Sequence, residues 1–423
     1  MKQLSIQQVK IGLFLVLAGV AASLVNPSTR ASALQQTRAT AQRQATPRGQ
    51  PSAAEKSAVA ARKPVRRIHD EYPQYSAVAV DPVNNEVVVA DENLFQMLVY
   101  DRDTNTPPGA AFSEPKRSIR GEDTFLELQC AVYIDPKNGD IYSLNNDTER
   151  HMTVWGRDQK GNVPPKWKLR TPMGSFGLAV DEERQEMLIT GQRGNVLAAY
   201  SKDAREDDPP SWVIWGDKTL LADPHGVALD TKKNVVFVAN FGSTASPRPL
   251  KPGEKLEVVA ADYNNLQRGT ARTLPVSITV YDRSARGDVA PIRVITGPQT
   301  QLNWPTGLFV DSEREELYVA NDGGNSILVF DTDDNGNAAP KRVLKGPKTL
   351  LHYPSSVFVD LNNDELFVAN FGNHRITVYP RTAQGDVAPI REIRSAPEGV
   401  AAPTLANVRI GYDTKRDQIL APN

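Results

Sequence analysis

The stretch "DPHGVALDTKKNVVFVAN", Asp223 to Asn240, decides the fold of this chain. Apolar and polar residues alternate on both sides of the polar turn TKKN, and this period-2 pattern predicts two antiparallel strands joined by a tight turn. Closely similar stretches recur along the 423-residue chain. Because their spacing is about 50 residues, the pattern predicts a propeller or a solenoid rather than a single continuous core.

The copies share one invariant offset. An Asp near the end of the first predicted strand is followed ten residues later by Asn, Asp or, once, Gly, in the pairs Asp81/Asp91, Asp135/Asn145, Asp181/Gly191, Asp230/Asn240, Asp311/Asn321, Asp360/Asn370 and Asp413/Asn423. A third strand follows in six copies, and then a fourth that begins with Pro, at Pro115, Pro165, Pro210, Pro291, Pro340 and Pro389. Proline cannot donate to a ladder, so it fits an outer edge strand. Four strands with the edge outermost describe a propeller blade.

The last copy stops at Asn423 with its first two strands only. The stretch PVRRI, Pro64 to Ile68, has the pattern of the missing outer strand, and SAVAA, Ser57 to Ala61, is a weaker match for the third. Closing the ring with these N-terminal strands beside the C-terminal hairpin would remove two exposed sheet edges. We therefore predict an all-β, seven-bladed β-propeller over residues 57–423. The alternative is a six-bladed ring with an appended hairpin.

Residues 1–33 have a basic start, the apolar run Ile11 to Val25 and an Ala-x-Ala site ending at Ala33, which predicts a cleaved secretory signal peptide. The expected location is secreted or periplasmic, with an uncleaved membrane anchor as the alternative and no stable membrane span after cleavage. Residues 34–56 are polar and rich in Ala, Gln and Arg, as in a disordered basic linker.

From Ile68 onward the chain has 38 Lys and Arg against 49 Asp and Glu, and this negative balance argues against nucleic acid as a partner. Cys130 is the single cysteine, so no intrachain disulfide is possible.

The phrases "GLFVDSEREELYVANDGGNSILVFD", from Gly307, and "SSVFVDLNNDELFVANFGNHRITVYP", from Ser355, resemble the repeats of the NHL and YVTN-type β-propeller superfamily. The resemblance covers nearly all of the chain after Ser57. It implies a fold and not one function, because members include lactonases, amidoglycolate lyases, streptogramin lyases and non-catalytic scaffolds. The catalytic members place metal ligands or histidines at the mouth of the central channel.

The residue five before each repeated Asp starts the predicted innermost strand, and around the ring these residues are Ser76, Cys130, Phe176, His225, Thr306, Ser355 and Val408. One His and one Cys do not supply the three ligands of an open zinc site, so no metal and no other cofactor is expected. His225 could act as a general base without a metal. It could equally hydrogen-bond the backbone of its loop.

The fourth repeat is interrupted. Tyr281 lies fifty-one residues after Asp230, where the other repeats need nineteen or twenty, so an insertion runs over about residues 241–276. Loops of this length in compact domains are usually functional or disordered. One face of the predicted ring carries the insertion together with His225, Trp304, His352 and Tyr353. We expect this face to bind the ligand, with Asn240, Asn321 and Asn370 as further contacts. Trp304 and Tyr353 could instead pack between blades, and the Asn side chains could bond nearby backbone. Asp331 to Asn337 resembles the start of a calcium loop but lacks its Glu.

Two functional hypotheses follow. The first is an exported, non-catalytic binding protein, expected to be a monomer, whose ligand face carries the insertion and whose partner is a protein, a glycan or a small molecule. The second is a lactonase- or lyase-like enzyme that uses His225 as its base. The two differ in whether further titratable groups lie within hydrogen-bond reach of His225.

Overall fold

A computed structural model describes residues 52–61, 70–147, 150–251, 254, 256, 265–402, 411–413 and 418–420. The chain divides into two compact units, Met1–Ile68 and His69–Asn423. The described part of the first unit contains the helix α2 (Ala53–Ala60). Its sequence AAEKSAVA is rich in alanine, the strongest helix former, which accounts for a helix there.

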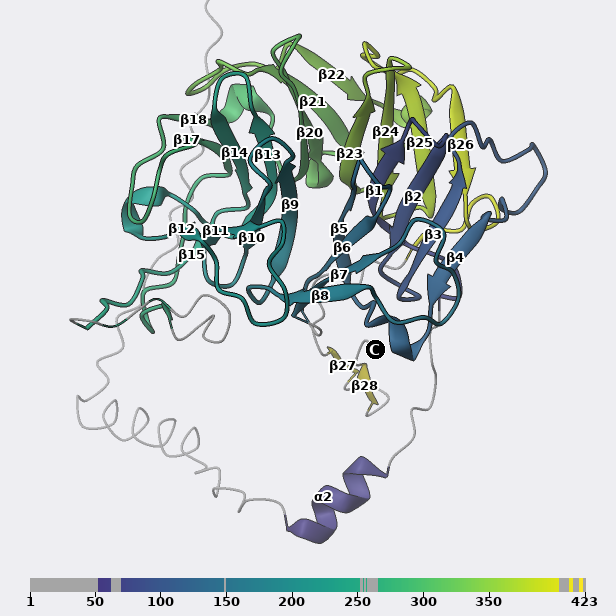
Figure 1. The fold of residues 1–423 in the computed structure, drawn as a ribbon. Coiled ribbons are helices and arrows are strands. Elements are labelled where there is room, and N and C mark those ends of the chain that lie inside the picture. The colour runs from purple at the N-terminus through teal and green to yellow at the C-terminus, as the bar shows by residue number, and fades with distance from the viewer. Residues whose placement is uncertain are drawn as a thin grey trace, which may run out of the picture. The chain divides into compact units, whose positions relative to one another are not determined.

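The described part of the second unit contains six four-stranded antiparallel sheets, each a propeller blade (Figure 1). In every blade the order from the inside outward follows the chain. The blades are β1 (Tyr75–Asp81), β2 (Glu86–Asp91), β3 (Gln96–Asp101), β4 (Arg117–Arg120); β5 (Gln129–Ile134), β6 (Ile141–Asn145), β7 (His151–Trp155), β8 (Trp167–Arg170); β9 (Ser175–Asp181), β10 (Glu186–Gly191), β11 (Val196–Ser201), β12 (Trp212–Ile214); β13 (Pro224–Asp230), β14 (Val235–Asn240), β17 (Ser277–Asp282), β18 (Arg293–Thr296); β19 (Pro305–Asp311), β20 (Glu316–Asn321), β21 (Ser326–Asp331), β22 (Arg342–Lys345); and β23 (Pro354–Asp360), β24 (Glu365–Asn370), β25 (Arg375–Pro380), β26 (Arg391–Arg394).

The repeated Asp closes the turn between the first two strands of each blade. In the quoted stretch the carboxylate of Asp230 accepts hydrogen bonds from the backbone N–H groups of Lys232 and Lys233, at 3.1 and 2.9 Å. These are the local bonds by which Asp favours turns. The strands pair in the predicted register, with Asp230 opposite Val235.

Each outer strand begins two residues after the predicted proline. In three blades the first residue of this strand is an arginine that pairs with a glutamate of the second strand. Arg342 donates to both carboxylate oxygens of Glu316, at 2.5 and 2.7 Å, across its own blade. Arg117 and Arg391 do the same with Glu86 and Glu365. In these three blades the Pro-x-Arg pattern therefore marks an outer strand that is tied to the second strand by a bidentate ion pair, whereas Arg293 of the fourth blade donates to the backbone oxygen of Thr332 at 2.8 Å.

The hydrophobic core is divided among the blade interfaces. Six clusters of buried residues each join two neighbouring blades, and the cluster containing Tyr75 and Val78 of the first blade includes Phe367 and Ile376 of the sixth. Figure 1 shows the purple-to-blue strands β1–β4 beside the yellow-green strands β23–β26. The ring is thus closed by packing of the first blade directly on the sixth.

Small residues allow the innermost strands to meet. A Cβ atom on Gly226 would lie 2.0 Å from the backbone oxygen of Thr306 in the next blade, and one on Gly177 would lie 2.5 Å from the oxygen of His225. Because these contacts are with backbone, no side chain can move aside to make room. Glycine is required at these two positions for close approach of strands.

The closing interface uses a variant of the contact that joins the other blades. At the fifth interface, for example, the N–H of Gly385 donates to the oxygen of Val343 at 2.7 Å, and the oxygen of Gly385 accepts from Lys345 at 3.1 Å. At closure Thr106 takes this place. Its N–H donates to the oxygen of Glu392 at 2.8 Å, while its Oγ1, in place of a backbone oxygen, accepts from the N–H of Arg394 at 2.8 Å.

The predicted seven-bladed ring is wrong, and the six-bladed alternative describes the structure. The seventh copy forms a separate two-stranded sheet, β27 (Gly411–Asp413) with β28 (Gln418–Leu420). Of the predicted third strand, Ser57 to Ala61, all but Ala61 falls in helix α2 instead. The predicted outer strand Pro64 to Ile68 lies outside the described residues. Since β1 already packs against β23, the six complete blades leave no gap for a seventh.

Candidate functional site

One face of the ring carries the starts of the first strands and the loops between the second and third strands; we call it the mouth face. Three rings of equivalent residues line it, counted from the repeated Asp. The first ring holds the residues seven positions before that Asp in each blade: Gln74, Leu128, Gly174, Asp223, Trp304 and Tyr353. The second ring holds the residues five positions before it: Ser76, Cys130, Phe176, His225, Thr306 and Ser355. The third ring holds the residues eleven positions after it: Glu92, Asn146, Gln192, Phe241, Asp322 and Phe371. We call the last set the mouth ring.

A repeated backbone bond holds these residues in place. The N–H of each mouth-ring residue donates to the carbonyl of the residue seven before the Asp in the same blade, as from Phe241 to Asp223 at 3.2 Å and from Asp322 to Trp304 at 3.0 Å. Asp223, Trp304 and Tyr353 have left-handed backbones, with φ of 55°, 53° and 47°. That conformation is uncommon for residues other than glycine and is concentrated at functional sites and tight turns.

Four rings from three blades form a continuous aromatic row on this face. Phe176 contacts His225 at a centroid distance of 4.4 Å, His225 stacks on Phe241 at 3.4 Å, and Phe241 is parallel to Trp304 within 15° at 5.5 Å. His225 is buried, Phe241 is half-buried, and Trp304 is 42% exposed. The row therefore ends in an aromatic ring that is open to solvent.

His225 is fully engaged inside this row. Its Nδ1 lies 2.9 Å from the backbone oxygen of Asp223, which only an N–H can satisfy, so Nε2 is left to accept from the side-chain amide of Gln192 at 2.6 Å. Burial lowers the pKa of His225 to about 3, against a small opposing effect of the bond to Asp223. The imidazole is neutral at physiological pH with both nitrogens occupied. The nearest carboxylate oxygen, on Asp223, is 3.7 Å away. This arrangement matches the backbone-bonding interpretation of His225 and offers no free base.

The three predicted Asn contacts are used by the fold. Asn240, Asn321 and Asn370 are buried, and each side-chain oxygen accepts from the N–H of a residue in the loop leading into its own blade, Ala222, Asn303 and His352, at 3.0, 2.6 and 3.1 Å. Their amide groups donate within the same blade. These side chains hold the loops of the mouth face from beneath.

His352 and Tyr353 lie on the same face one blade further along. The Nδ1 of His352 lies 2.7 Å from the oxygen of Gly372, and its ring contacts that of Tyr353 at 4.7 Å. The Tyr353 N–H donates to Asn325 at 2.8 Å. Both side chains are half-buried, so they contribute to the face without reaching the row that contains His225.

Two acids of the mouth ring were not predicted. Glu92 and Asp322 are half-buried, and among the described residues their carboxylates have no hydrogen-bond or ion-pair partner. Burial raises the pKa of Asp322 to about 7; burial, together with the nearby charges of Asp91 and Asp147, raises that of Glu92 to about 8. Their place in the repeat could have identified them, because Glu92 directly follows Asp91 and Asp322 directly follows Asn321, the second members of the repeated pairs.

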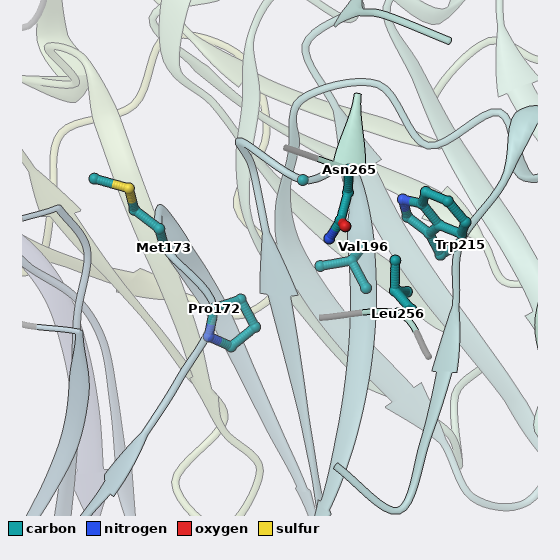
Figure 2. A pocket seen from close by; sticks show the side chains of 7 residues that line it. Pro172, Met173, Val196, Trp215, Leu256 and Asn265 are labelled. Carbon is teal, nitrogen blue, oxygen red and sulfur yellow. The ribbon is translucent and has the colours of Figure 1, made fainter. Parts of the chain in front are cut away.

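The described parts of the insertion extend the fourth blade over the rim of the third. They include the short pair β15 (Ser243–Thr244) and β16 (Arg272–Thr273), anchored by a 3.0 Å bond from Asn195 to Thr244 and by the Arg272–Asp217 ion pair. The hollow beneath (Figure 2) is lined by Pro172, Met173, Gly194, Val196, Trp215, Leu256 and Asn265, and its cavity volume is only about 10 Å³. That volume is far below the roughly 300–1,000 Å³ of typical ligand sites.

Within the described ranges no group of three or more His, Cys, Asp or Glu side chains is arranged to hold a metal ion. The segment Asp331 to Asn337, which resembles the start of a calcium loop, contacts the preceding blade. The N–H of Gly336 donates to the oxygen of Val294, and the side-chain oxygen of Asn337 accepts from the N–H of Gln299. No helix in the described part of the chain has the length and apolar character to cross a membrane.

Comparison with known proteins supports the fold. The model of the NHL repeat matches residues 351–379, which confirms the predicted resemblance for that stretch. A search of curated proteins found no similar sequence. Among solved structures the chain is similar to Kuenenia stuttgartiensis hydrazine synthase, with 11% identity and a TM-score of 0.47 over 75% of this chain and 99% of that one. The described part of the chain is a β-propeller of six four-stranded blades, and residues 351–379 within it match the NHL repeat.

Proposed function

We propose that this propeller is an exported binding protein whose ligand lies on the mouth face against Trp304. The observation that carries the proposal is the aromatic row, which leads from buried rings to a solvent-exposed indole. Large apolar side chains that are rigidly supported and exposed together are typical of recognition surfaces. Propeller loops on a rigid ring also suit this task, because the scaffold positions them without moving itself.

The support beneath Trp304 is specific to this face. Its ring is backed by Phe241, its backbone is held by the bond to Asp322, and its left-handed φ keeps it at the start of the first strand. Preorganised aromatic anchors lose little conformational entropy on binding, so they contribute affinity efficiently. The exposed apolar residues elsewhere, such as Ile292 on the outer side of the fourth blade, lack such backing by a row of rings.

A thermal-shift screen tests the proposal. The purified protein is heated with cellobiose, chitobiose, choline and short peptides as probes, beside the variants Trp304→Ala and Ile292→Ala. A probe present at a hundred times its Kd stabilises by about 2.7 kcal/mol, which is about 3 °C for a domain of this size. We expect at least one probe to shift the wild type and Ile292→Ala but not Trp304→Ala. A shift that survives Trp304→Ala, or no shift with any probe, would overturn the proposal.

Export is the second part of the proposal and comes from the predicted signal peptide, which lies outside the described residues. Expression of the full chain in a bacterial host, followed by N-terminal sequencing of the accumulated protein, tests it. We expect a periplasmic product that begins just after Ala33. Retention of Met1 on a cytoplasmic product would contradict export.

A further inference from the structure

A cleft lies between the first and second blades, at the end of the strands opposite the mouth face. Its volume of about 740 Å³ falls within the roughly 300–1,000 Å³ of typical ligand sites. The turn between β1 and β2, the turn between β5 and β6 and the loop after β7 line it, and they contribute Asp81, Lys137, Gly139 and Arg157 among others. No residue of the three rings on the mouth face lines this cleft, so it is separate from the surface proposed above.

The arginine of this cleft has equivalents in other blades. In four blades an arginine stands two residues after the aromatic residue near the end of the third strand, as Arg102, Arg157, Arg283 and Arg381. In the first and sixth blades its Nε donates to the turn residue that lies four positions after the repeated Asp. Arg102 bonds Asn85 at 2.9 Å in this way, and Arg381 bonds Asp364 at 2.6 Å. The side chain of the turn therefore serves as the acceptor for the arginine of its own blade.

The second blade lacks this acceptor. The residue four positions after Asp135 is Gly139, and its φ of 73° is in the left-handed region, as is that of Asn85 and of Asp364. Because glycine has no side chain to accept from the arginine, the buried Nε of Arg157 has no hydrogen-bond partner among the described residues. The side chain of Arg157 lies over the glycine instead, since a Cβ atom on Gly139 would be 2.7 Å from its Cδ.

The terminal nitrogens of Arg157 are also held loosely. Nη2 lies 3.6 Å from Glu86, whose carboxylate is already bound by both terminal nitrogens of Arg117 at 2.8 Å. Nη1 donates at 3.2 Å to Asp158, a side chain that is 90% exposed. The side chain of Arg157 is 30% exposed, whereas those of its three equivalents are between 3% and 16% exposed. Its guanidinium therefore keeps N–H groups for a further acceptor.

The two buried acids that line the cleft do not compete for this guanidinium. Asp81 accepts three hydrogen bonds within its own turn, at 2.6 to 3.0 Å, and Asp135 is bound by the ammonium group of Lys202 at 2.7 Å. The other base in the lining, Lys137, is 64% exposed and lies 3.5 Å from Glu182. The cleft thus combines two weakly paired cations with buried acids that already have partners.

We propose that this cleft binds a carboxylate, which accepts from Arg157 as Asp364 accepts from Arg381. Arginine pairs with carboxylates through charge-assisted hydrogen bonds, which are stronger than bonds to neutral acceptors. Lys137 adds a second positive charge, and the volume leaves room for the rest of a small acid or for an acidic side chain of a polypeptide. The inference goes beyond the proposed binding at Trp304 and does not depend on it.

The test compares benzoate with benzamide, its neutral isostere, by isothermal titration calorimetry on the full-length protein at neutral pH. We expect benzoate to bind and benzamide to bind at least about tenfold more weakly, because only benzoate carries the charge that strengthens these bonds. Arg157→Gln should weaken benzoate binding by about tenfold or more and leave benzamide binding unchanged. Arg184→Gln is the matched control. It removes the same charge from the turn after β9, at the same end of the strands, where Arg184 is 51% exposed, and it should bind benzoate as the wild type does.

Gly139→Asp tests the site without removing its arginine. This variant supplies the carboxylate that the sixth blade has at Asp364, and aspartate tolerates the left-handed backbone at both places. We expect benzoate binding to fall by about tenfold or more, at a melting temperature equal to or above that of the wild type, because the new side chain occupies Arg157. The same measurement decides the proposal if Arg157→Gln does not fold.

Two capped peptides, Gly-Asp-Gly and its neutral counterpart Gly-Asn-Gly, identify the source of the carboxylate. If Gly-Asp-Gly binds more tightly than benzoate and depends on Arg157, the occupant is an acidic side chain of a polypeptide; the reverse order assigns a small free acid, and both results support the proposal. Equal binding of benzoate and benzamide, undiminished benzoate binding in Gly139→Asp, or an equal loss in Arg184→Gln and Arg157→Gln overturns it. So does a failure of both benzoate and Gly-Asp-Gly to bind at concentrations up to about 10 mM.

Discussion

Replacing Lys202 with Met should destabilise the propeller more than any other loss of a single charge at the interface of the second and third blades. The ammonium group of Lys202, whose side chain is 5% exposed, lies 2.7 Å from Asp135 Oδ2 and also bonds Glu182. Asp135 is itself 6% exposed. Removal of the Lys202 ammonium would leave the Asp135 carboxylate buried without a counter-charge.

The magnitude follows from the distance and the burial. Two unit charges 2.7 Å apart attract by about 6 kcal/mol at an effective dielectric constant of about 20. Desolvation offsets part of this attraction, and breaking one side of a buried pair costs about 3–5 kcal/mol. For a domain of this size, that loss lowers the melting temperature by about 4–7 °C. Lys137→Met is the control, because Lys137 is 64% exposed and lies 3.5 Å from the same Glu182, where a pair contributes about 1 kcal/mol or less.

The pH dependence gives an independent check. Although burial raises it, the pKa of Glu182 is held at about 2 by hydrogen bonds from Lys202, Tyr133 and Gln185. A lowered carboxylate pKa contributes stability above its unfolded value of about 4.5, and that stability is lost as the pH falls toward 2. The gap between wild type and Lys202→Met, measured by scanning calorimetry, should therefore narrow from pH 7 to pH 3. A gap no larger than that of Lys137→Met, or one that stays constant with pH, would refute the reasoning.

Three further outcomes test other parts of the structure. Gly226→Ala should destabilise the fold by more than about 3 kcal/mol, because its Cβ would lie 2.0 Å from the Thr306 oxygen; a melting temperature close to wild type would show that the innermost strands can separate. The imidazole of His225, with its pKa lowered to about 3, should show no titration between pH 5 and 8 by NMR, and the stability that its neutral form contributes should fall as the pH drops from about 6.5 toward 3; a midpoint near 6.5 would contradict its burial. Starting the chain at His69 should leave the melting temperature within about 2 °C of the full chain, because six blades close without residues 1–68. A large drop in melting temperature would support the predicted closure of the ring by N-terminal strands.

Much of the blade was predictable because its determinants are local. The alternation in Asp223 to Asn240, the turn bonds of Asp230 and the edge position of the proline-led strand all depend on residues close in sequence. The site was predictable only in part. The sequence placed Trp304 on the same face as His225, as the aromatic row shows, but its stacking partner Phe241 and the acid Asp322 were missed, although each directly follows a residue of the repeated pattern.

By itself, the sequence determined the strand order within each blade, the place of the insertion and the identity of the repeat, because short-range alternation and turn chemistry specify them. The number of blades was decided only by the tertiary structure. Seven sequence copies yield six blades because closure depends on side-chain packing between β1 and β23. It also depends on Thr106, whose Oγ1 accepts from the N–H of Arg394 where the other interfaces use a backbone oxygen. Thr106 and Arg394 are 288 positions apart, so their contact is not evident from the sequence. The role of His225 was likewise decided in three dimensions, since Gln192 and Phe241 reach it from elsewhere in the chain and keep it neutral.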